Sequence, residues 1–345
     1  MAVGAIVPAG RVEVLGEVNR RRRAVSVELV GTMLAAWVDG ALGTDAANTR
    51  AAYAADVVEF MRWHDEAGGG PVTRAAVAAW AGAMLDAGLA RSTVNRRLSA
   101  VRRIVREAAA AGLLDDDTAR AIAGVKGVKV TGARAGRWLG KDAALALLHA
   151  PDVRRMSGRR DRAMLALLLG GGLRRDELAR LEVDQVRQVA GRWAIVDLEG
   201  KGGRLRTVPI PSWCYVAVRE WMDAAGITDG HIMRPVNRGG RVVGESMTAS
   251  AIWYRVRLYA SRLADAGVPA SVDEAGRPDL DTWRAFSAHD ARRTFAKLAY
   301  AGGAPLDQVQ LSLGHASIRT TERYLGVEQN MHDAPCDRLG ISVGG

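Results

Sequence analysis

The sequence predicts a mainly α-helical protein with a small β-hairpin (an α+β fold), divided into an N-terminal helical domain and a larger C-terminal domain. The chain has 345 residues, a length that suits two domains better than one. Apolar residues recur at helical spacing through most of it, and two strand-like segments are joined by Gly200-Lys201-Gly202-Gly203. Hydrophobic residues make up 48% and charged residues 25%, so there is material for two folded cores.

The net charge indicates what kind of partner the protein binds, and the cysteines indicate the cellular compartment. The net charge of +10 favours a polyanionic partner, with nucleic acid the first candidate, although many soluble proteins are also basic. Cys214 and Cys336 lie far apart without metal-ligand spacing, which favours a reducing cytosol and argues against structural zinc. No apolar run approaches a membrane span and no secretory signal is evident. We therefore expect a cytoplasmic protein without a metal or other cofactor.

The pattern along the chain predicts five segments. Residues 1–25 have the composition of a basic flexible arm, and residues 26–124 are helical almost throughout. Residues 125–137 mix Gly, Lys and Arg in the manner of a linker. The second domain spans 138–326, and 327–345 forms a C-terminal tail.

One helix of the first domain has two distinct faces. In the segment STVNRRLSAVRRIVREAAAAG an apolar stripe recurs at helical spacing. A second stripe of short polar and guanidinium side chains has the chemistry to lie along a DNA backbone. For this helix alone a merely solvated basic face is the simpler interpretation. The second stripe consists of Ser92, Arg96, Ser99, Arg103 and Arg106.

The second domain is predicted as helices, a hairpin and more helices. The hairpin strands are RWAIVDLE and RLRTVPI, with Lys201 at the tip. Only five of the 48 basic residues are lysines, so a lysine at this exposed tip is notable. Unlike Arg, Lys can give up a proton. Residues 264–285 are rich in Asp, Gly, Pro and Arg and predict a long loop.

Two short signals pair charged side chains on one helical face. Arg174 stands where a helix begins after Gly170-Gly171-Gly172, and Glu177 three residues later can orient its guanidinium. His289 and Arg292 are also three apart, so both side chains point to one side of a helix. In isolation each pair is more often a surface or capping pair than a site.

A further signal surrounds a tyrosine. The helix LDQVQLSL stops at Gly314 and leaves His315 on the turn, and a short helix beginning near Ser317 carries Tyr324. The phenol of tyrosine has a pKa of about 10, so it is a poor nucleophile without cationic neighbours and a proton acceptor. Alone, a helical tyrosine is usually a core aromatic.

In this order and spacing, the signals together resemble the tyrosine recombinase, or phage integrase, family with the simple two-domain organisation of the Xer recombinases. The matching residues are Gly172-Leu173-Arg174, Gly200-Lys201-Gly202, His289 with Arg292, and Leu313-Gly314-His315 followed nine residues later by Tyr324. The first domain also resembles the family's helical, SAM-like core-binding domain, so the resemblance covers roughly residues 44–327.

The resemblance implies a mechanism for a DNA strand transferase. Tyr324 would attack the scissile phosphate, leaving a 3′-phosphotyrosyl bond and a free 5′-hydroxyl. Arg174 and Arg292 would bind the non-bridging oxygens, and Lys201 would be the general acid for the departing 5′-oxygen. His289 would assist proton transfer, His315 would hydrogen-bond the phosphate, and Glu177 would hold the cations in place.

The resemblance also implies partners. We expect double-stranded recombination sites, a Holliday-junction intermediate, a homotetramer on DNA whose tail docks on the neighbouring subunit, and directionality or host factors. The enzyme would be associated with the nucleoid. Alternatives are a type IB topoisomerase or telomere resolvase, or a non-catalytic DNA-binding protein of the same fold. The candidate DNA contacts are Thr49, Arg50, Ser92, Thr93, Arg96, Arg97, Arg103, Arg255 and Arg257.

Overall fold

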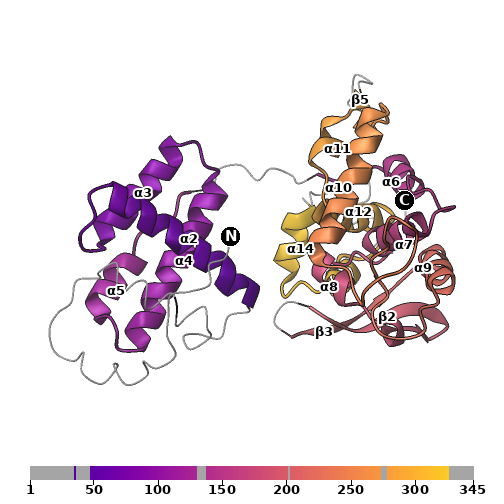
Figure 1. The fold of residues 1–345 in the computed structure, drawn as a ribbon, viewed down its shortest axis with the longest axis horizontal. Coiled ribbons are helices and arrows are strands. Elements are labelled where there is room, and N and C mark those ends of the chain that lie inside the picture. Colours follow the sequence, from indigo (N-terminus) through magenta and orange to yellow (C-terminus); the bar gives the residue numbers. More distant parts are fainter. Residues whose placement is uncertain (1–34, 36–46, 130–136, 201–202, 273–277, 326–345) are drawn as a thin grey trace, which may run out of the picture. The chain divides into compact units, whose positions relative to one another are not determined.

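The computed structural model describes residue 35 and residues 47–129, 137–200, 203–272 and 278–325 (Figure 1). Their contacts divide the chain into two compact units, Met1–Ala133 and Arg134–Gly345. The predicted fold class is confirmed, because both units are mainly helical and the second also contains a small sheet. The predicted arm and tail lie outside the described residues, and the domain limits drawn from the sequence stay predictions.

The first unit is a helical bundle with one core. Thr73 and Asp115 cap two of its helices by accepting the backbone N–H groups of Ala76 and Thr118. The predicted apolar stripe of the 91–110 helix is buried throughout, and Phe60 packs against Trp80 with ring centroids 5.0 Å apart. The helices are α2 (Ala47–Glu66), α3 (Arg74–Asp86), α4 (Arg91–Ala110) and α5 (Asp116–Ala123).

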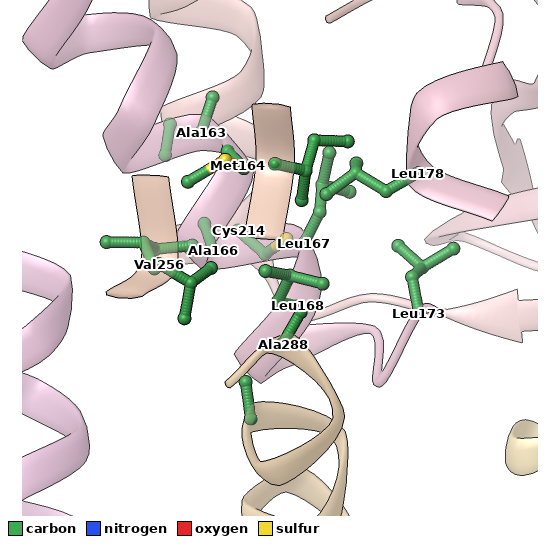
Figure 2. Close-up of a cluster of buried hydrophobic side chains, with 14 of the residues drawn as sticks. Ala163, Met164, Ala166, Leu167, Leu168, Leu173, Leu178, Cys214, Val256 and Ala288 are labelled. Atoms are coloured by element: carbon green, nitrogen blue, oxygen red, sulfur yellow. The ribbon is translucent and has the colours of Figure 1, made fainter. Parts of the chain in front are cut away.

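The second unit is built around a central buried helix, α7 (Met156–Gly170). Residues 163–168 of α7 are fully buried and meet side chains from the surrounding elements, among them Cys214, Val256 and Ala288 (Figure 2). Burial raises the pKa of the Cys214 thiol, so this cysteine is an inert core residue. The other helices are α6 (Lys141–His149), α8 (Arg175–Arg180), α9 (Ser212–Ala225), α10 (Ala249–Asp265), α11 (Asp281–Ala285), α12 (Ala288–Ala301), α13 (Leu306–Leu313) and α14 (Ile318–Leu325).

The predicted hairpin is confirmed and gains a third strand. Strands β1 (Val186–Val189), β2 (Arg192–Glu199) and β3 (Leu205–Pro209) form an antiparallel sheet in the order β1-β2-β3. The register of β2 against β3 shifts between Ile195 and Leu198, where Asp197 has a φ of 51°. This β-bulge twists the end of β2 that leads to the hairpin tip.

The prediction of one long loop over residues 264–285 is wrong. The short strands β4 (Ser271–Val272) and β5 (Pro278–Asp279) pair in this region, and α11 follows them. Trp283 is buried, and its indole N–H donates to the Val268 carbonyl at 2.8 Å. The polar composition of the segment gave no indication that Trp283 is buried. Within the described residues, every helix is too short or too polar to cross a membrane.

Candidate active site

Arg174 and Glu177 meet at the start of α8, as the sequence predicted. Gly172 adopts a φ of 60°, a left-handed conformation that a side chain would strain, and a Cβ there would lie 2.5 Å from the Phe295 ring. The chain thereby turns from α7 so that Arg174 caps α8. Glu177 accepts the Arg174 backbone N–H at 2.8 Å and its guanidinium at 2.6 Å.

Arg206 of β3 is a site residue that the sequence analysis missed. Its guanidinium donates to both oxygens of Glu177, with Nη1–Oε1 at 2.9 Å and Nη2–Oε2 at 2.8 Å. Its Nε donates to the Ser312 carbonyl at 3.0 Å. Burial raises the pKa of Glu177, but the hydrogen bonds from Arg206 and the Arg174 backbone outweigh this effect and lower that pKa to about 2. Glu177 is therefore a permanent anion at the centre of the cluster.

Arg292 completes the cationic cluster from α12. Its side chain is 1% exposed; Nη1 donates to the Gly172 carbonyl at 2.6 Å and Nη2 donates to the Leu313 carbonyl. Nη1 also lies 3.8 Å from Glu177 Oε2. Burial and the nearby charge of Arg174 lower the pKa of Arg292 to about 9. A bound anion would relieve this repulsion, because it would neutralise part of the positive charge.

The turn after α13 brings a fourth group to the cluster. Gly314 ends the helix with a φ of 62°, and the Leu313 carbonyl before it accepts from Arg174 at 3.5 Å as well as from Arg292. His315 follows and hydrogen-bonds through Nδ1 with the Thr321 hydroxyl at 2.9 Å. Burial and the charge of Arg292 lower the pKa of His315 to about 4. His315 is thus neutral near pH 7 and acts as a hydrogen-bonding group rather than a cation.

Tyr324 of α14 lies between the two histidines. Its ring centroid is 5.7 Å from that of His289 and 5.4 Å from that of His315, both edge to face. Its hydroxyl donates to the His289 carbonyl at 3.4 Å. Burial raises the pKa of Tyr324, and the charges of Arg292 and Arg293 oppose this effect. The tyrosine is therefore protonated in the DNA-free protein.

His289 has the protonation state that a proton acceptor needs. Burial, together with the positive charge of Arg293, lowers its pKa below the ordinary value. It is therefore neutral near pH 7, with a lone pair available on one ring nitrogen. A neutral imidazole beside the Tyr324 ring can accept a proton that the phenol loses.

Lys201 lies outside the described residues, but the strand end that leads to it is placed. The Gly200 N–H donates to the Arg204 carbonyl at 2.8 Å, which closes the base of the hairpin tip. A Cβ on Gly200 would lie 3.2 Å from Arg206 Nη1 and 3.8 Å from Arg174 Nη1. The residue before Lys201 is therefore next to the cationic cluster.

The structure separates the two candidate DNA contacts on α10. Arg255 points into the protein, where Nε donates to the buried Asp161 carboxylate at 2.9 Å and Nη2 to the Tyr259 hydroxyl at 3.1 Å. Arg257 lies instead over the ring of Trp253, with the guanidinium carbon 5.6 Å from the ring centroid. Trp253 and the adjacent Tyr254 are both exposed. Of the two arginines, Arg257 is therefore the better candidate for a DNA contact, because its neighbour is an exposed aromatic ring and not a buried carboxylate.

The candidate DNA contacts of the first unit are spread over α2 and α4. Arg96 and Arg97 both approach the buried Asp56, and Arg103 pairs with Glu107 at 3.1 Å. Arg96 nevertheless keeps a side chain that is 48% exposed. Ser92 is exposed, whereas the remaining candidates are partly buried, namely Thr49, Arg50 and Thr93.

Across the two units, the described residues contain no group of three or more His, Cys, Asp or Glu side chains arranged to hold a metal ion. The cluster itself has a different chemistry. Three guanidinium groups surround one carboxylate, and two neutral histidines flank a phenol. Such a site can bind an oxyanion and move a proton to or from the phenol beside it.

Comparison with known proteins gives consistent matches over both units. Residues 137–331 match the phage integrase family, and residues 43–112 match the phage integrase N-terminal SAM-like domain. The chain is 31% identical over 248 residues to the tyrosine recombinase XerC of Pelobacter propionicus, covering 71% of this chain and 72% of that protein. It is 30% identical over 299 residues to the tyrosine recombinase XerD of Pseudomonas aeruginosa, covering 84% and 89%.

Solved structures of two other integrases have a similar fold. The Tn1549 transposon integrase in complex with circular intermediate DNA superposes with a TM-score of 0.61 at 16% identity, covering 88% of this chain and 96% of that one. A lambda integrase dimer bound to a core site gives a TM-score of 0.60 at 17% identity, covering 88% and 98%. At these identities the likeness establishes the fold.

Proposed function

Because this chain belongs to the phage integrase family and is a site-specific tyrosine recombinase, we propose that Tyr324 is its nucleophile and that the cluster around Glu177 binds the scissile phosphate. The observation that carries the proposal is the position of Tyr324 between His289 and His315, beside arginines that converge on the Leu313 carbonyl. The rival activities of a type IB topoisomerase, a telomere resolvase or a non-catalytic DNA-binding protein are not favoured, since the curated relatives are named tyrosine recombinases.

In the proposed cleavage step, the Tyr324 oxygen forms a bond to phosphorus and the bond to the 5′-oxygen breaks. His289 accepts the phenol proton, and Lys201 donates a proton to the departing 5′-oxygen. Arg174 and Arg292 stabilise the charge that develops on the non-bridging oxygens, and His315 hydrogen-bonds one of them. The product is a 3′-phosphotyrosyl bond and a free 5′-hydroxyl.

Rejoining reverses the step with the 5′-hydroxyl of another strand. The phosphodiester energy is kept in the protein–DNA bond, so two successive exchanges pass through a Holliday junction. We propose a homotetramer on two duplex sites, with residues 327–345 docking on the neighbouring subunit. In the cell the substrate would be nucleoid DNA.

The DNA partner is supported by charge and by relatives. The chain carries a net charge of +10, and the solved structures named above are described as bound to DNA. Ser92 and Arg96 on α4 are the exposed proposed contacts, and Arg257 on α10 is partly exposed and lies over the exposed Trp253.

The test of the nucleophile is covalent trapping on DNA. Tyr324→Phe protein, which lacks the attacking oxygen, selects a core site from a random duplex library by binding alone. The selected site, nicked beside the scissile phosphate, then serves as a suicide substrate. Wild-type protein should form a covalent adduct that resists denaturant, and Tyr324→Phe should bind the site yet form none. An adduct with Tyr324→Phe would refute the assignment.

The test of the general acid uses the same substrate. Lys201→Ala should slow cleavage by about a hundredfold or more, in the range for loss of general acid catalysis. A substrate with sulfur at the 5′-bridging position has a leaving group that needs no proton, so it should restore the rate. Failure of that rescue would remove the general-acid role.

A further inference from the structure

Arg293 contacts the Tyr324 ring but belongs to none of the signals that predicted the site. It follows Arg292 on α12, and successive helical residues point about 100° apart. Arg292 therefore turns toward Glu177 and Leu313, whereas the guanidinium carbon of Arg293 lies 4.7 Å from the centroid of the Tyr324 ring. This separation is well inside the cation–π range of about 6 Å.

Apart from its contact with the Tyr324 ring, the Arg293 guanidinium makes only weak interactions. Its side chain is 17% exposed, and Nη1 lies 3.9 Å from Asp290 Oδ1, beyond hydrogen-bonding distance. Its Nε is buried and has no hydrogen-bond partner within the described part of the chain. Asp290 accepts the Ser287 N–H and hydroxyl at the start of α12 through its other carboxylate oxygen, Oδ2, so Oδ1 remains a distant counter-ion of Arg293. The Tyr324 ring is thus a principal neighbour of this cation.

The cations around Tyr324 differ in what they do once DNA is bound. In the proposed cleavage step, Arg174 and Arg292 are paired with the phosphate oxygens, so their charge is largely cancelled. Arg293 stacks on the ring and is not part of the Glu177 cluster, so the phosphate does not cancel its charge, which only the Asp290 carboxylate 3.9 Å away offsets in part. A phenol that must become a phenolate is stabilised by such a cation.

We propose that Arg293 is a positioning residue that clamps the Tyr324 ring and supplies the cation that favours its phenolate during cleavage. The inference rests on the proposed function of Tyr324. It rests on geometry, namely stacking at 4.7 Å, burial and a loosely satisfied guanidinium. The lowering influence of Arg293 on the Tyr324 pKa agrees with it.

Other groups also act on the phenol, so the effect of Arg293 has to be isolated from theirs. The positive charges of Arg174 and Arg292 lower the Tyr324 pKa, and the negative charge of Asp290 raises it. The two histidines are neutral near pH 7. The charged and titratable groups that act on or contact the ring are His289, Asp290, Arg292 and Arg293 of α12, Arg174, and His315 of the preceding turn. Its own helix, α14, also carries Arg319 and Glu322, both exposed.

The experiment measures cleavage of the nicked suicide substrate in single turnover from pH 6 to pH 10. Arg293→Gln should cleave between about twofold and thirtyfold more slowly at neutral pH, the range expected for a lost cation–π contact. The rising limb of its pH profile should move to higher pH, because the phenol then loses its proton less readily. Arg293→Lys keeps the charge and should leave the limb near its wild-type position.

Lys297→Gln is the matched control. Lys297 lies one turn further along α12, and its ammonium lies over the ring of Trp138, 5.6 Å from the ring centroid. Its loss should leave the pH profile unchanged. If Arg293→Gln does not fold, as judged by thermal melting, Arg293→Met supplies a neutral side chain that keeps the apolar stem.

The outcomes separate the two proposals. If wild-type protein forms no Tyr324-dependent adduct, the proposed function itself fails. If wild-type protein forms the adduct while the neutral Arg293 variants keep its rate and pH profile, only the present inference fails. It fails equally if Arg293→Lys and the neutral variants are slowed alike with no movement of the pH limb, since that pattern indicates a purely structural role.

Discussion

Arg206 of β3 holds Glu177 of α8 through a bidentate ion pair, with N–O distances of 2.9 and 2.8 Å. The two side chains are 9% and 2% exposed, so both charges depend on each other. Arg206 also binds the Ser312 carbonyl of α13. One guanidinium therefore joins the hairpin that carries Lys201 to the helix that begins after Arg174 and to the turn that carries His315.

Arg206→Ala should lower the free energy of unfolding by about 3–5 kcal/mol, because it leaves the buried Glu177 carboxylate without its main partner. Urea denaturation followed by tryptophan fluorescence measures the change. Arg187→Ala on the same sheet, which removes an exposed pair with Asp197 at 3.5 Å, should cost less than about 1 kcal/mol. Equal effects of the two variants would contradict the role given to Arg206.

Gly314→Ala should abolish most cleavage activity. A Cβ at this position would lie 2.9 Å from Arg206 Cδ and 3.2 Å from its Nε, so the Arg206 side chain has to shift, and we expect this to disturb its ion pair with Glu177. We expect at least about a tenfold loss in the rate of adduct formation, in line with the cost of misplacing catalytic groups.

The control for this variant is Gly226→Ala. Gly226 ends α9 with a φ of 64°, close to the 62° of Gly314, and a Cβ there meets no atom within 4 Å. Both substitutions should cost about 1–2 kcal/mol of stability from left-handed strain. Only Gly314→Ala should lose cleavage, and a similar loss with Gly226→Ala would point to strain rather than to Arg206.

Alanine substitutions of Arg257 and Arg255 should affect different properties, namely DNA binding for Arg257 and protein stability for Arg255. Arg257→Ala should weaken binding to the selected site and lower the slope of log affinity against log salt by about 1, as expected for one lost phosphate contact. Arg255→Ala should destabilise the protein, because Asp161 is fully buried, and leave the salt slope unchanged. Fluorescence anisotropy at several salt concentrations measures the slopes. A reduced slope for folded Arg255→Ala protein would reverse the assignment.

The low pKa of His315 should make stability depend on pH. The unfolded histidine binds a proton below about pH 6.5, whereas the folded one stays neutral down to its pKa of about 4. The unfolded state therefore binds more protons in this window, and stability is lost as pH falls through it. The loss should be on the order of 2 kcal/mol after partial solvent screening.

His315→Gln should reduce this dependence between pH 6.5 and pH 4, as measured by urea denaturation at each pH, and the remainder should include the contribution of His289, whose pKa is also lowered. His149→Gln, which removes an exposed histidine of α6, serves as the control and should keep the wild-type dependence. If His315→Gln loses as much stability on acidification as the wild type, the histidine is not responsible.

The features that depend on local sequence pattern could be predicted from the sequence alone. The apolar stripe of α4 is buried as its spacing predicted, and Arg174, Glu177, His289, Arg292, His315 and Tyr324 meet at one site. The short helix carrying Tyr324 begins at Ile318, one residue from the predicted start.

Features that depend on distant partners could not be predicted in the same way. Arg206 looked like any other arginine of an arginine-rich chain, because its partner Glu177 is 29 residues away. Arg255 and Arg257 were equivalent candidates until Asp161, 94 residues from Arg255, was found to bind one of them. The strands and the helix within residues 264–285 were missed because they depend on contacts that composition does not show, such as that of the buried Trp283 with the Val268 carbonyl.

Arg292 is anchored by the backbone carbonyls of Gly172 and Leu313 rather than by side-chain acceptors. Every amino acid supplies the same carbonyl, so substitutions of the Leu313 side chain do not remove the acceptor. What moves it is a change in the path of the chain, which the left-handed glycines at 172 and 314 set. A saturation mutagenesis screen would therefore find much of the sensitivity of this anchor at two glycines, of which Gly172 is itself an acceptor and Gly314 follows the other acceptor. At Leu313, which is fully buried, substitutions would act through packing rather than through loss of the carbonyl.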